Sequence, residues 1–149
     1  MSQLPTPAEL LPHSAPMILV DELLSSEGGK ARARVVVRPE SMFVEQGRVP
    51  AVIAIEYMAQ AVGLQAGMES RRKGNPIRVG YLLGTREMTL EVDHFEVGDE
   101  LVVEVERLFG EEQLGSFRCS ILRGDKQVAA AVLSVYQNNK VDLPEERTK

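Results

Sequence analysis

Apolar and polar side chains alternate with a period of two along several stretches of the chain. In the stretch 100–110, Leu101, Val103 and Val105 share one face, and Glu104 and Glu106 share the other. Because successive side chains of a strand point to opposite faces, this alternation predicts a strand with one buried face. Further strands are predicted over 16–26, 30–39, 78–91, 111–124 and 125–137, with hairpin turns at Gly28-Gly29 and Gly124-Asp125 and a bulge or close backbone approach at Gly84.

One stretch breaks the alternation. Residues 49–67, VPAVIAIEYMAQAVGLQAG, are almost all apolar or small. We predict a helix from about Pro50 to Arg72, because proline suits the first helical turn and the GNP sequence after Lys73 stops a helix. The run is about as long as a membrane span, but Glu56, Gln60 and Gln65 interrupt it, so a buried helix of a soluble protein is favoured.

The remaining segments carry weaker patterns. TPAELL predicts a short helix over about 6–11, since Thr6, Pro7 and Glu9 fit a capping box with proline at the first position. Residues 39–50 show no period and are expected to form a loop. The C-terminal tail, about 138–149, is polar.

The order of the predicted elements is two strands, one long helix and four strands, without repeats or linkers. We therefore expect a single α+β domain over 1–149. A helix that is apolar on most sides needs cover all round. A curved antiparallel sheet supplies part of it, and a second copy pairing edge strand to edge strand supplies the rest, so we expect a dimer.

Composition excludes some classes of function. The chain has 149 residues, is 44% hydrophobic and carries a net charge of -5, which disfavours nucleic-acid binding. Its single cysteine, Cys119, forms no internal disulfide and fits a reducing compartment as a buried strand residue. No secretory signal is recognisable near residue 1, so the expected location is the cytoplasm.

Two residues are candidates for chemistry. Glu56 lies within the apolar helix, where a charged carboxylate is costly unless it is paired or protonated. It is either a structural acid or a functional one, since perturbed acids cluster at active sites. His13 lies between Pro12 and Pro16, in a loop of restricted shape. It either packs on the strand below or serves as an aimed imidazole.

Other chemistry is less supported. His94 is expected to be a solvated turn residue, and the two histidines have no metal-ligand spacing, so no metal site is predicted. GxSxG, P-loop and GxGxxG motifs are absent from the sequence. The basic cluster formed by Arg71, Arg72, Lys73 and Arg78 complements a helix end, and it is alternatively a docking patch for an acidic partner.

Three stretches together resemble one family. LLPHSAPMILVDELL is similar to the LPHRxPFLLVD-like signature, PAVIAIEYMAQAVG to the PGVLxxEAMAQ signature, and VGYLLGTREMTLEVDHFEVGDEL to the YxxGIxxxxFxxPVxPGDxL region of the hotdog-fold 3-hydroxyacyl-acyl-carrier-protein dehydratases (FabZ family). The wording LLGTR, residues 82–86, resembles the ApeP branch of aryl polyene pathways. The resemblance implies a hotdog fold, in which a curved antiparallel sheet wraps a central helix.

The resemblance also assigns roles. The catalytic acid of the EAMAQ motif falls on Glu56. The glycine after the motif's proline falls on Ala51, whose N–H at the helix N-terminus would polarise a thioester carbonyl. Gln60 and Gly84 are the further substrate-binding candidates. Acyl carrier protein is the implied partner, its phosphopantetheine carries the substrate, and no other cofactor is implied.

One position departs from the family. The family's catalytic histidine falls on Met42, and a thioether cannot take a proton from carbon. Either His13 serves as the base, or the chain is a non-catalytic subunit that partners an active hotdog protein. We favour dehydration, with His13 taking the proton beside the carbonyl and a neutral, buried Glu56 protonating the departing hydroxyl. A hotdog thioesterase is the other alternative, and homodimer and heterodimer remain open.

Overall fold

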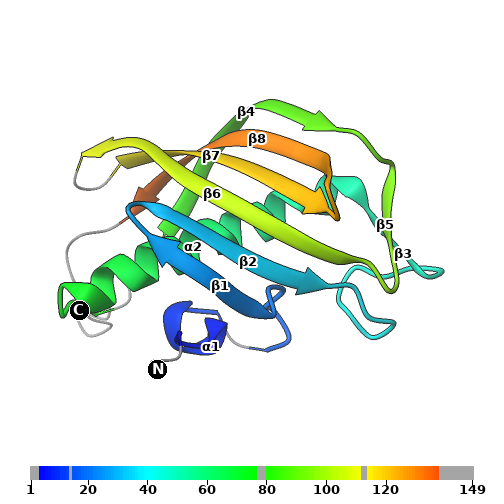
Figure 1. Ribbon diagram of the computed structural model, residues 1–149, viewed down its shortest axis with the longest axis horizontal. Coiled ribbons are helices and arrows are strands. Elements are labelled where there is room, and N and C mark those ends of the chain that lie inside the picture. The colour runs from blue at the N-terminus through cyan, green and yellow to red at the C-terminus, as the bar shows by residue number, and fades with distance from the viewer. Residues whose placement is uncertain (1–3, 14, 77–79, 112–113, 138–149) are drawn as a thin grey trace, which may run out of the picture.

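The computed structural model describes residues 4–13, 15–76, 80–111 and 114–137. Within these residues, two helices, a 3-10 turn and eight strands follow one another (Figure 1). Their bounds are α1 Pro7–Leu10, β1 Glu22–Glu27, β2 Lys30–Val36, β3 Arg48–Pro50, η1 Ala51–Ile53, α2 Ala54–Arg72, β4 Gly80–Leu90, β5 His94–Glu96, β6 Glu100–Glu111, β7 Leu114–Arg123 and β8 Lys126–Gln137.

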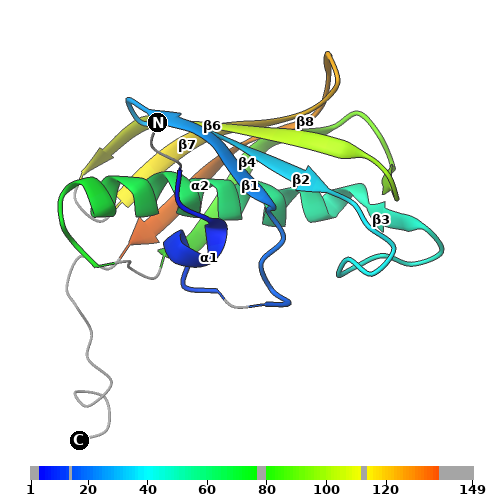
Figure 2. The same cartoon turned by 60° about the horizontal axis from the view of Figure 1, so that its bottom comes forward.

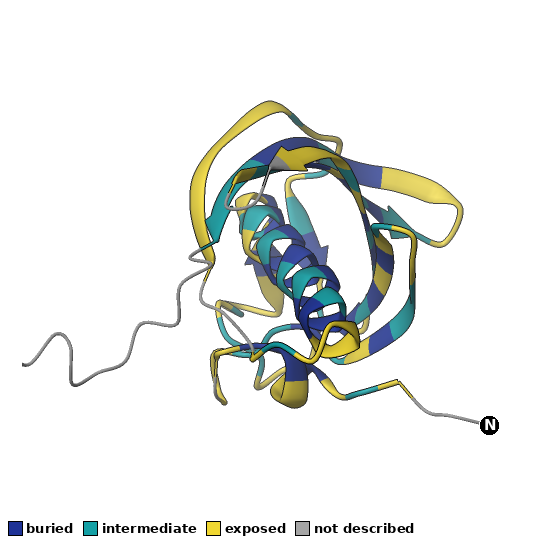
Figure 3. Cartoon of the chain, turned by 90° about the vertical axis from the view of Figure 1, so that its left-hand side faces the viewer, coloured by how far each residue is buried: buried dark blue, intermediate teal, exposed yellow. Residues whose placement is uncertain are grey.

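Six strands form one antiparallel sheet in the order β1-β2-β6-β7-β8-β4. The sheet curves round α2, which lies against its concave side, and α1 lies on the helix away from the strands (Figure 2). Figure 3, which looks along α2, shows the strands curving round it. The predicted α+β wrap is therefore confirmed, and this arrangement leaves part of α2 without cover from the sheet.

The alternation in the sequence sets which side chains enter the core. Leu101, Val103 and Val105 of β6 are buried against α2, while Glu104 is half-buried and Glu106 exposed. The hairpin between β1 and β2 turns at Gly28 and Gly29, both with positive φ (59° and 80°), a conformation that favours glycine. The burial of one face of β6 and the glycine turn between β1 and β2 are thus consistent with the observed pairing of these strands.

Three local expectations are wrong. Residues 17–21 are not a strand, and β1 begins only at Glu22. Within the expected loop 39–50, β3 pairs with β5 as a separate two-stranded sheet, so His94 is a half-buried strand residue opposite Pro50 rather than a solvated turn residue. A 3-10 turn, η1, separates Pro50 from the start of α2 at Ala54.

β4 is an edge strand of the large sheet. Its pairing with β8 shifts register between Leu82 and Gly84, so the predicted bulge at Gly84 is confirmed. Almost every residue of β4 is exposed, including Tyr81, Leu82 and Leu83. A long apolar edge strand favours pairing with another chain, as the predicted dimer requires.

In the described part of the chain, no helix is both long and apolar enough to cross a membrane.

Candidate active site

A cavity of about 240 Å³ runs along the face of α2 that the sheet leaves uncovered. Its walls come from residues 7–13, which are α1 and the residues after it up to His13 (the α1 segment), from α2, and from the ends of β4, β6, β7 and β8. Three of the residues selected from the sequence line it: His13, Glu56 and Gln60. The structure therefore brings the predicted base and acid to one cavity.

Small residues on α2 let the α1 segment approach closely. A Cβ added at Gly67 would lie 2.7 Å from the carbonyl oxygen of Leu10, and one added at Gly63 would lie 2.7 Å from Cδ2 of Leu11. Glycine at these two positions thus allows the segment that leads to His13 to pack directly on the helix. The same face of α2, with Ala59 and Ala66, forms one wall of the cavity.

Glu56 stands in the first turn of α2, and it is exposed in the single chain. The expectation of a buried carboxylate is therefore wrong for this protomer. The reason is that the sheet covers the opposite side of α2, whereas the α1 segment covers the helix only around Gly63 and Gly67. Glu56 faces the open cavity, where a substrate or a second subunit would exclude water from it.

Gln60 anchors the loop that follows His13. Its amide oxygen accepts hydrogen bonds from the backbone N–H groups of Leu19 (2.8 Å) and Val20 (3.4 Å), and its amide nitrogen donates to the carbonyl of Met17 (2.7 Å). These bonds explain why residues 17–20 do not join the sheet as a strand, and contact with the sheet begins at Asp21, whose N–H donates to the carbonyl of Arg34 at 2.8 Å. Gln60 lines the cavity, and its hydrogen bonds hold the loop in place.

Two further substrate-binding candidates, Ala51 and Gly84, do not line the cavity of the single chain. The N–H of Ala51 donates to the carbonyl of Asp93 at 2.9 Å, so it is not free to polarise a thioester carbonyl. Ala51 is also buried and does not line the cavity. Gly84 lies on the exposed edge strand β4, outside the cavity wall, where a Cβ would meet nothing within 4 Å.

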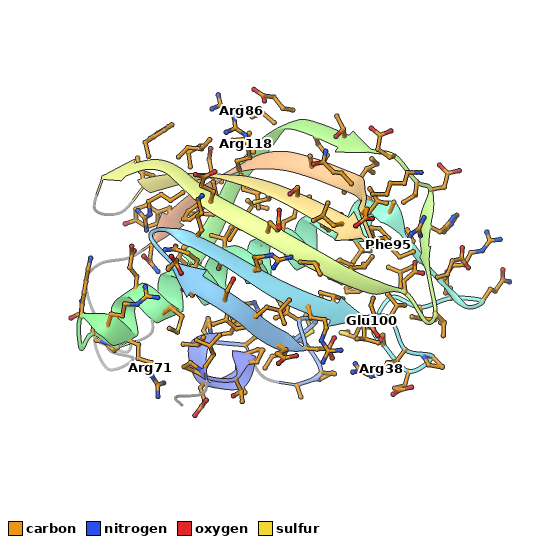
Figure 4. The ribbon with its side chains drawn as sticks, viewed as in Figure 1. Arg38, Arg71, Arg86, Phe95, Glu100 and Arg118 are labelled. Atoms are coloured by element: carbon orange, nitrogen blue, oxygen red, sulfur yellow. The ribbon has the colours of Figure 1, made fainter. Side chains whose placement is uncertain are left out.

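The basic cluster lies at the far end of α2 from Glu56. Arg71, Arg72 and Lys73 are exposed, and Arg71 projects from the C-terminal end of the helix (Figure 4). Arg72 donates to the backbone carbonyl of Ser26 at 2.9 Å, which ties the helix end to β1. Arg78 lies outside the described residues.

Met42 lies in the loop between β2 and β3, is half-buried and is not part of the cavity wall. No histidine of the described chain other than His13 and His94 is available, and only His13 lines the cavity. His13 is therefore the imidazole that the described protomer offers to this site.

Burial raises the pKa of the Cys119 thiol to about 12, which keeps it protonated and excludes a nucleophilic role near neutral pH. Burial, with a smaller contribution from Asp21, also raises the pKa of Tyr57 to about 12, and its ring packs on Phe95. Among the described residues, no group of three His, Cys, Asp or Glu side chains could hold a metal ion.

Sequence reasoning missed one charged residue in the cavity wall, Arg107. The signal was present, because Leu101, Val103 and Val105 alternate toward the core and the next position of that series is Arg107. The inward-facing residues of β6 thus line the core up to Val105 and the cavity at Arg107.

Comparison with known proteins identifies the family. The family model described as ApeP dehydratase matches residues 5–145. The 3-hydroxyacyl-[acyl-carrier-protein] dehydratase FabZ of Yersinia pestis (strain Pestoides F) is 32% identical over 147 residues, which cover 93% of this chain and 80% of that protein.

Solved structures show the same fold. A chain of the dehydratase heterocomplex ApeI:P from Xenorhabdus doucetiae superposes with a TM-score of 0.89 at 30% identity, covering 99% of this chain and 100% of that one. A hypothetical thioesterase from Streptococcus pneumoniae, solved with coenzyme A, superposes with a TM-score of 0.63 at 13% identity over 81% of this chain and 88% of that one. The second likeness concerns the fold alone. The chain has the hotdog fold and belongs to the ApeP-like dehydratase family.

Proposed function

We propose that this chain removes water from a 3-hydroxyacyl thioester carried on acyl carrier protein and leaves the 2-enoyl thioester, in fatty-acid-like or aryl polyene synthesis. The observation that carries the proposal is that His13 and Glu56, an imidazole and a carboxyl group, line one cavity in a member of a dehydratase family. Elimination needs a proton acceptor and a proton donor together.

The two groups take complementary roles. His13 accepts the proton from the carbon beside the thioester carbonyl. The electron pair forms the new double bond, and the hydroxyl leaves from the next carbon with a proton from Glu56. Glu56 must be neutral to donate, and exclusion of water by the bound acyl chain favours the neutral carboxyl.

No cofactor takes part in the proposed reaction, because elimination of water moves protons and changes no net oxidation state. The phosphopantetheine of the carrier protein holds the substrate. We place the reaction in the cytoplasm, where a chain with one buried, unpaired cysteine is stable.

Acyl carrier protein is the proposed partner of Arg71, Arg72, Lys73 and Arg78. The support is electrostatic, because this cluster is basic in a chain with a net charge of -5. The fifteen residues from Glu56 to Arg71 span about 22 Å along the helix at 1.5 Å per residue. A flexible arm has to cover that distance, and reversal of charge at Arg71 and Lys73 is expected to raise KM more than it lowers kcat.

A second hotdog subunit is the proposed cover for β4. The exposed edge strand, with its apolar residues, supports pairing between chains, and the similar Xenorhabdus doucetiae chain belongs to a heterocomplex. Whether the second subunit is a copy of this chain or a different hotdog protein is decided by the size of the purified protein in solution, alone and mixed with a candidate partner.

The activity test uses a 3-hydroxyacyl carrier protein, with the enoyl product detected by mass spectrometry. His13→Ala and Glu56→Gln are each expected to lower kcat by about 10²- to 10⁴-fold, the usual contribution of a positioned acid or base. His94→Ala and Glu40→Gln are the matched controls, because neither residue lines the cavity, and both are expected to retain activity.

Three outcomes would contradict the proposal in different ways. Full activity of His13→Ala would show that another group is the base. Activity that appears only on mixing with another hotdog subunit, and that survives both His13→Ala and Glu56→Gln, would make this chain a non-catalytic partner. Release of free thiol from acyl-CoA without enoyl product would instead identify a thioesterase.

A further inference from the structure

The outer face of the large sheet, on the side away from α2, carries exposed apolar and charged side chains at one end. On β7, Phe117 and Cys119 belong to the core, so the alternate residues Ser116 and Arg118 lie on the outer face. Phe109 of β6 pairs with Ser116 and is 64% exposed. An exposed aromatic ring of this kind indicates a surface that another molecule covers.

Cross-strand pairing arranges the residues of this face in rows across β6, β7, β8 and β4, in that order. One row consists of Phe109, Ser116, Ser134 and Gly84, and the next consists of Glu106, Arg118, Val132 and Arg86. Residues that pair across strands share a face of the sheet. Arg86 and Arg118 accordingly project from the same end of the sheet (Figure 4).

The two ends of the first row differ in shape. The β6 end carries the exposed ring of Phe109, whereas the β4 end is Gly84, which has no side chain. A Cβ added at Gly84 would meet nothing within 4 Å, so the space above it is open. The residues between these ends, Ser116 and Ser134, are small. The row therefore combines a protruding ring with a place that can receive one.

The two ends of the second row differ in charge. The β6 end is Glu106, whose carboxylate lies 4.0 Å from Nζ of Lys30. The β4 end is Arg86, and neither it nor Arg118 forms an ion pair within 4.0 Å among the described residues. An exposed acid and an exposed base thus stand at opposite ends of one row.

Both rows match themselves under the same rotation. A two-fold axis parallel to the strands, between β7 and β8, exchanges the β6 end of each row with the β4 end of that row in a second copy. It brings each Phe109 to the partner's Gly84 and each Glu106 to the partner's Arg86. We propose that the outer face of β6, β7, β8 and β4 binds a second copy of this chain through this two-fold contact. A different protein would need to reproduce both matches, whereas a copy supplies them by symmetry.

This surface is distinct from the exposed edge of β4, which pairs with another strand in the plane of the sheet. Sheets that pack face to face lie about 10 Å apart, a gap that the side chains of phenylalanine, glutamate and arginine can fill from both sides. The four strands and the residues from Leu114 to Arg118 span about 14 Å in each direction. This area is small for a stable interface, so we expect association in the micromolar range. The inference goes beyond the proposed reaction and does not depend on it.

The test measures the mass of the protein by sedimentation velocity over a concentration series that crosses the micromolar range. The wild-type protein is expected to double its mass as concentration rises, starting from whichever state pairing at the β4 edge gives. Phe109→Ser is expected to weaken the doubling at least about thirtyfold, the effect of removing an interface anchor. Phe43→Ser is the matched control, because Phe43 is an exposed phenylalanine in the loop between β2 and β3, and it is expected to double as the wild type does.

A second variant fills the open space instead of removing the ring. Gly84→Val adds a side chain that meets no neighbour within its own chain, and valine suits a strand. Its melting temperature is therefore expected to stay at or above that of the wild type. The new side chain occupies the place of the partner's ring, so the doubling is expected to be lost.

Charge exchange shows whether the contact runs between copies. Arg86→Glu brings like charges together at both ends of the second row, and so does Glu106→Arg, so neither variant alone is expected to double. An equimolar mixture of the two variants brings opposite charges together at both places, and its mass is expected to double. Recovery in the mixture requires the two residues to meet across an interface.

The outcomes that overturn the proposal are distinct. A wild-type mass that stays constant over the series overturns it, even where a different hotdog subunit binds this face. Doubling that persists in both Phe109→Ser and Gly84→Val places the contact on another surface. A mixture of Arg86→Glu and Glu106→Arg that fails to double, with both variants folded, contradicts the two-fold arrangement.

Discussion

Gly67→Ala tests whether the α1 segment is held by direct contact with the helix. In a helix interior, replacing glycine by alanine alone would stabilise the fold by about 1 kcal/mol. Here the new methyl group would lie 2.7 Å from the carbonyl oxygen of Leu10 and 3.1 Å from its Cβ. Both Gly67 and Leu10 are buried, so the contact cannot open into solvent.

The change in the free energy of unfolding is the difference between the cost of overpacking and the gain in helix propensity. Overpacking a well-packed site costs about 1–3 kcal/mol. We take the upper part of that range because the obstructing atom belongs to the backbone, and after the gain in helix propensity we expect a net loss of about 1–2 kcal/mol. A domain of this size then loses about 2–8 °C in melting temperature.

Gly63→Ala is the matched comparison. Its new methyl group would meet Cδ2 of Leu11, the end of a flexible side chain that can rotate away. Its net effect is expected to lie between no change and a gain of about 1 kcal/mol. Both variants are measured by urea unfolding at one fixed protein concentration, because association changes apparent stability. If Gly67→Ala is as stable as Gly63→Ala, the close packing of Leu10 on the helix is not what positions this segment.

Three further predictions follow from other contacts. Gln60→Leu removes the hydrogen bonds to Met17, Leu19 and Val20 and leaves their backbone groups unpaired, so urea unfolding is expected to show a loss of about 2–4 kcal/mol; an unchanged midpoint would contradict the anchoring role. Cys119, with a thiol pKa of about 12 and full burial, is expected to resist iodoacetamide at pH 8 in the native protein and to react once urea unfolds it, whereas rapid native labelling would refute its burial. Tyr57 and Cys119 have pKa values raised above their ordinary 10.0 and 9.0, so the unfolded chain loses these protons at a lower pH than the folded chain does. The free energy of unfolding is therefore expected to fall from about pH 9 toward pH 12. Cys119→Ala and Tyr57→Phe should each flatten that decline, and an unchanged slope would count against the raised pKa values.

Sequence patterns predicted correctly those elements whose structure depends only on neighbouring residues. The alternation around Leu101 depends only on which face of one strand is buried, and the turn at Gly28-Gly29 depends on a conformation that glycine adopts easily. The bulge near Gly84 was also predictable, because an isolated glycine in a strand pattern often marks an interrupted ladder.

Contacts between distant residues were not predictable in this way. Residues 17–20 have the composition of a strand, but the amide of Gln60, about forty residues later, takes the backbone hydrogen bonds of Met17, Leu19 and Val20. The N–H of Ala51 donates to the carbonyl of Asp93, an acceptor that only the folded chain brings near. The exposure of Glu56 depends on where the α1 segment ends its contact with α2, which no period in the sequence encodes.

His13 and Glu56 came from motifs, and the structure places both in the wall of one cavity. Arg107 had no motif, and only the continuation of a strand pattern indicated that it faces inward. A residue of a cavity wall leaves a weaker trace in sequence than one in a catalytic motif, because many side chains can close a cavity.

The contact between Gly67 and Leu10 also constrains how sequences of this family can diverge. A side chain at the place of Gly67 would push the carbonyl of Leu10 away, and with it Leu11 and Pro12, the two residues that lead to His13. In an alignment of relatives, glycine at this position is therefore expected to vary together with the length and spacing of the segment before the histidine. Chains that carry a larger residue there should hold their histidine at a different place, or have no histidine to hold.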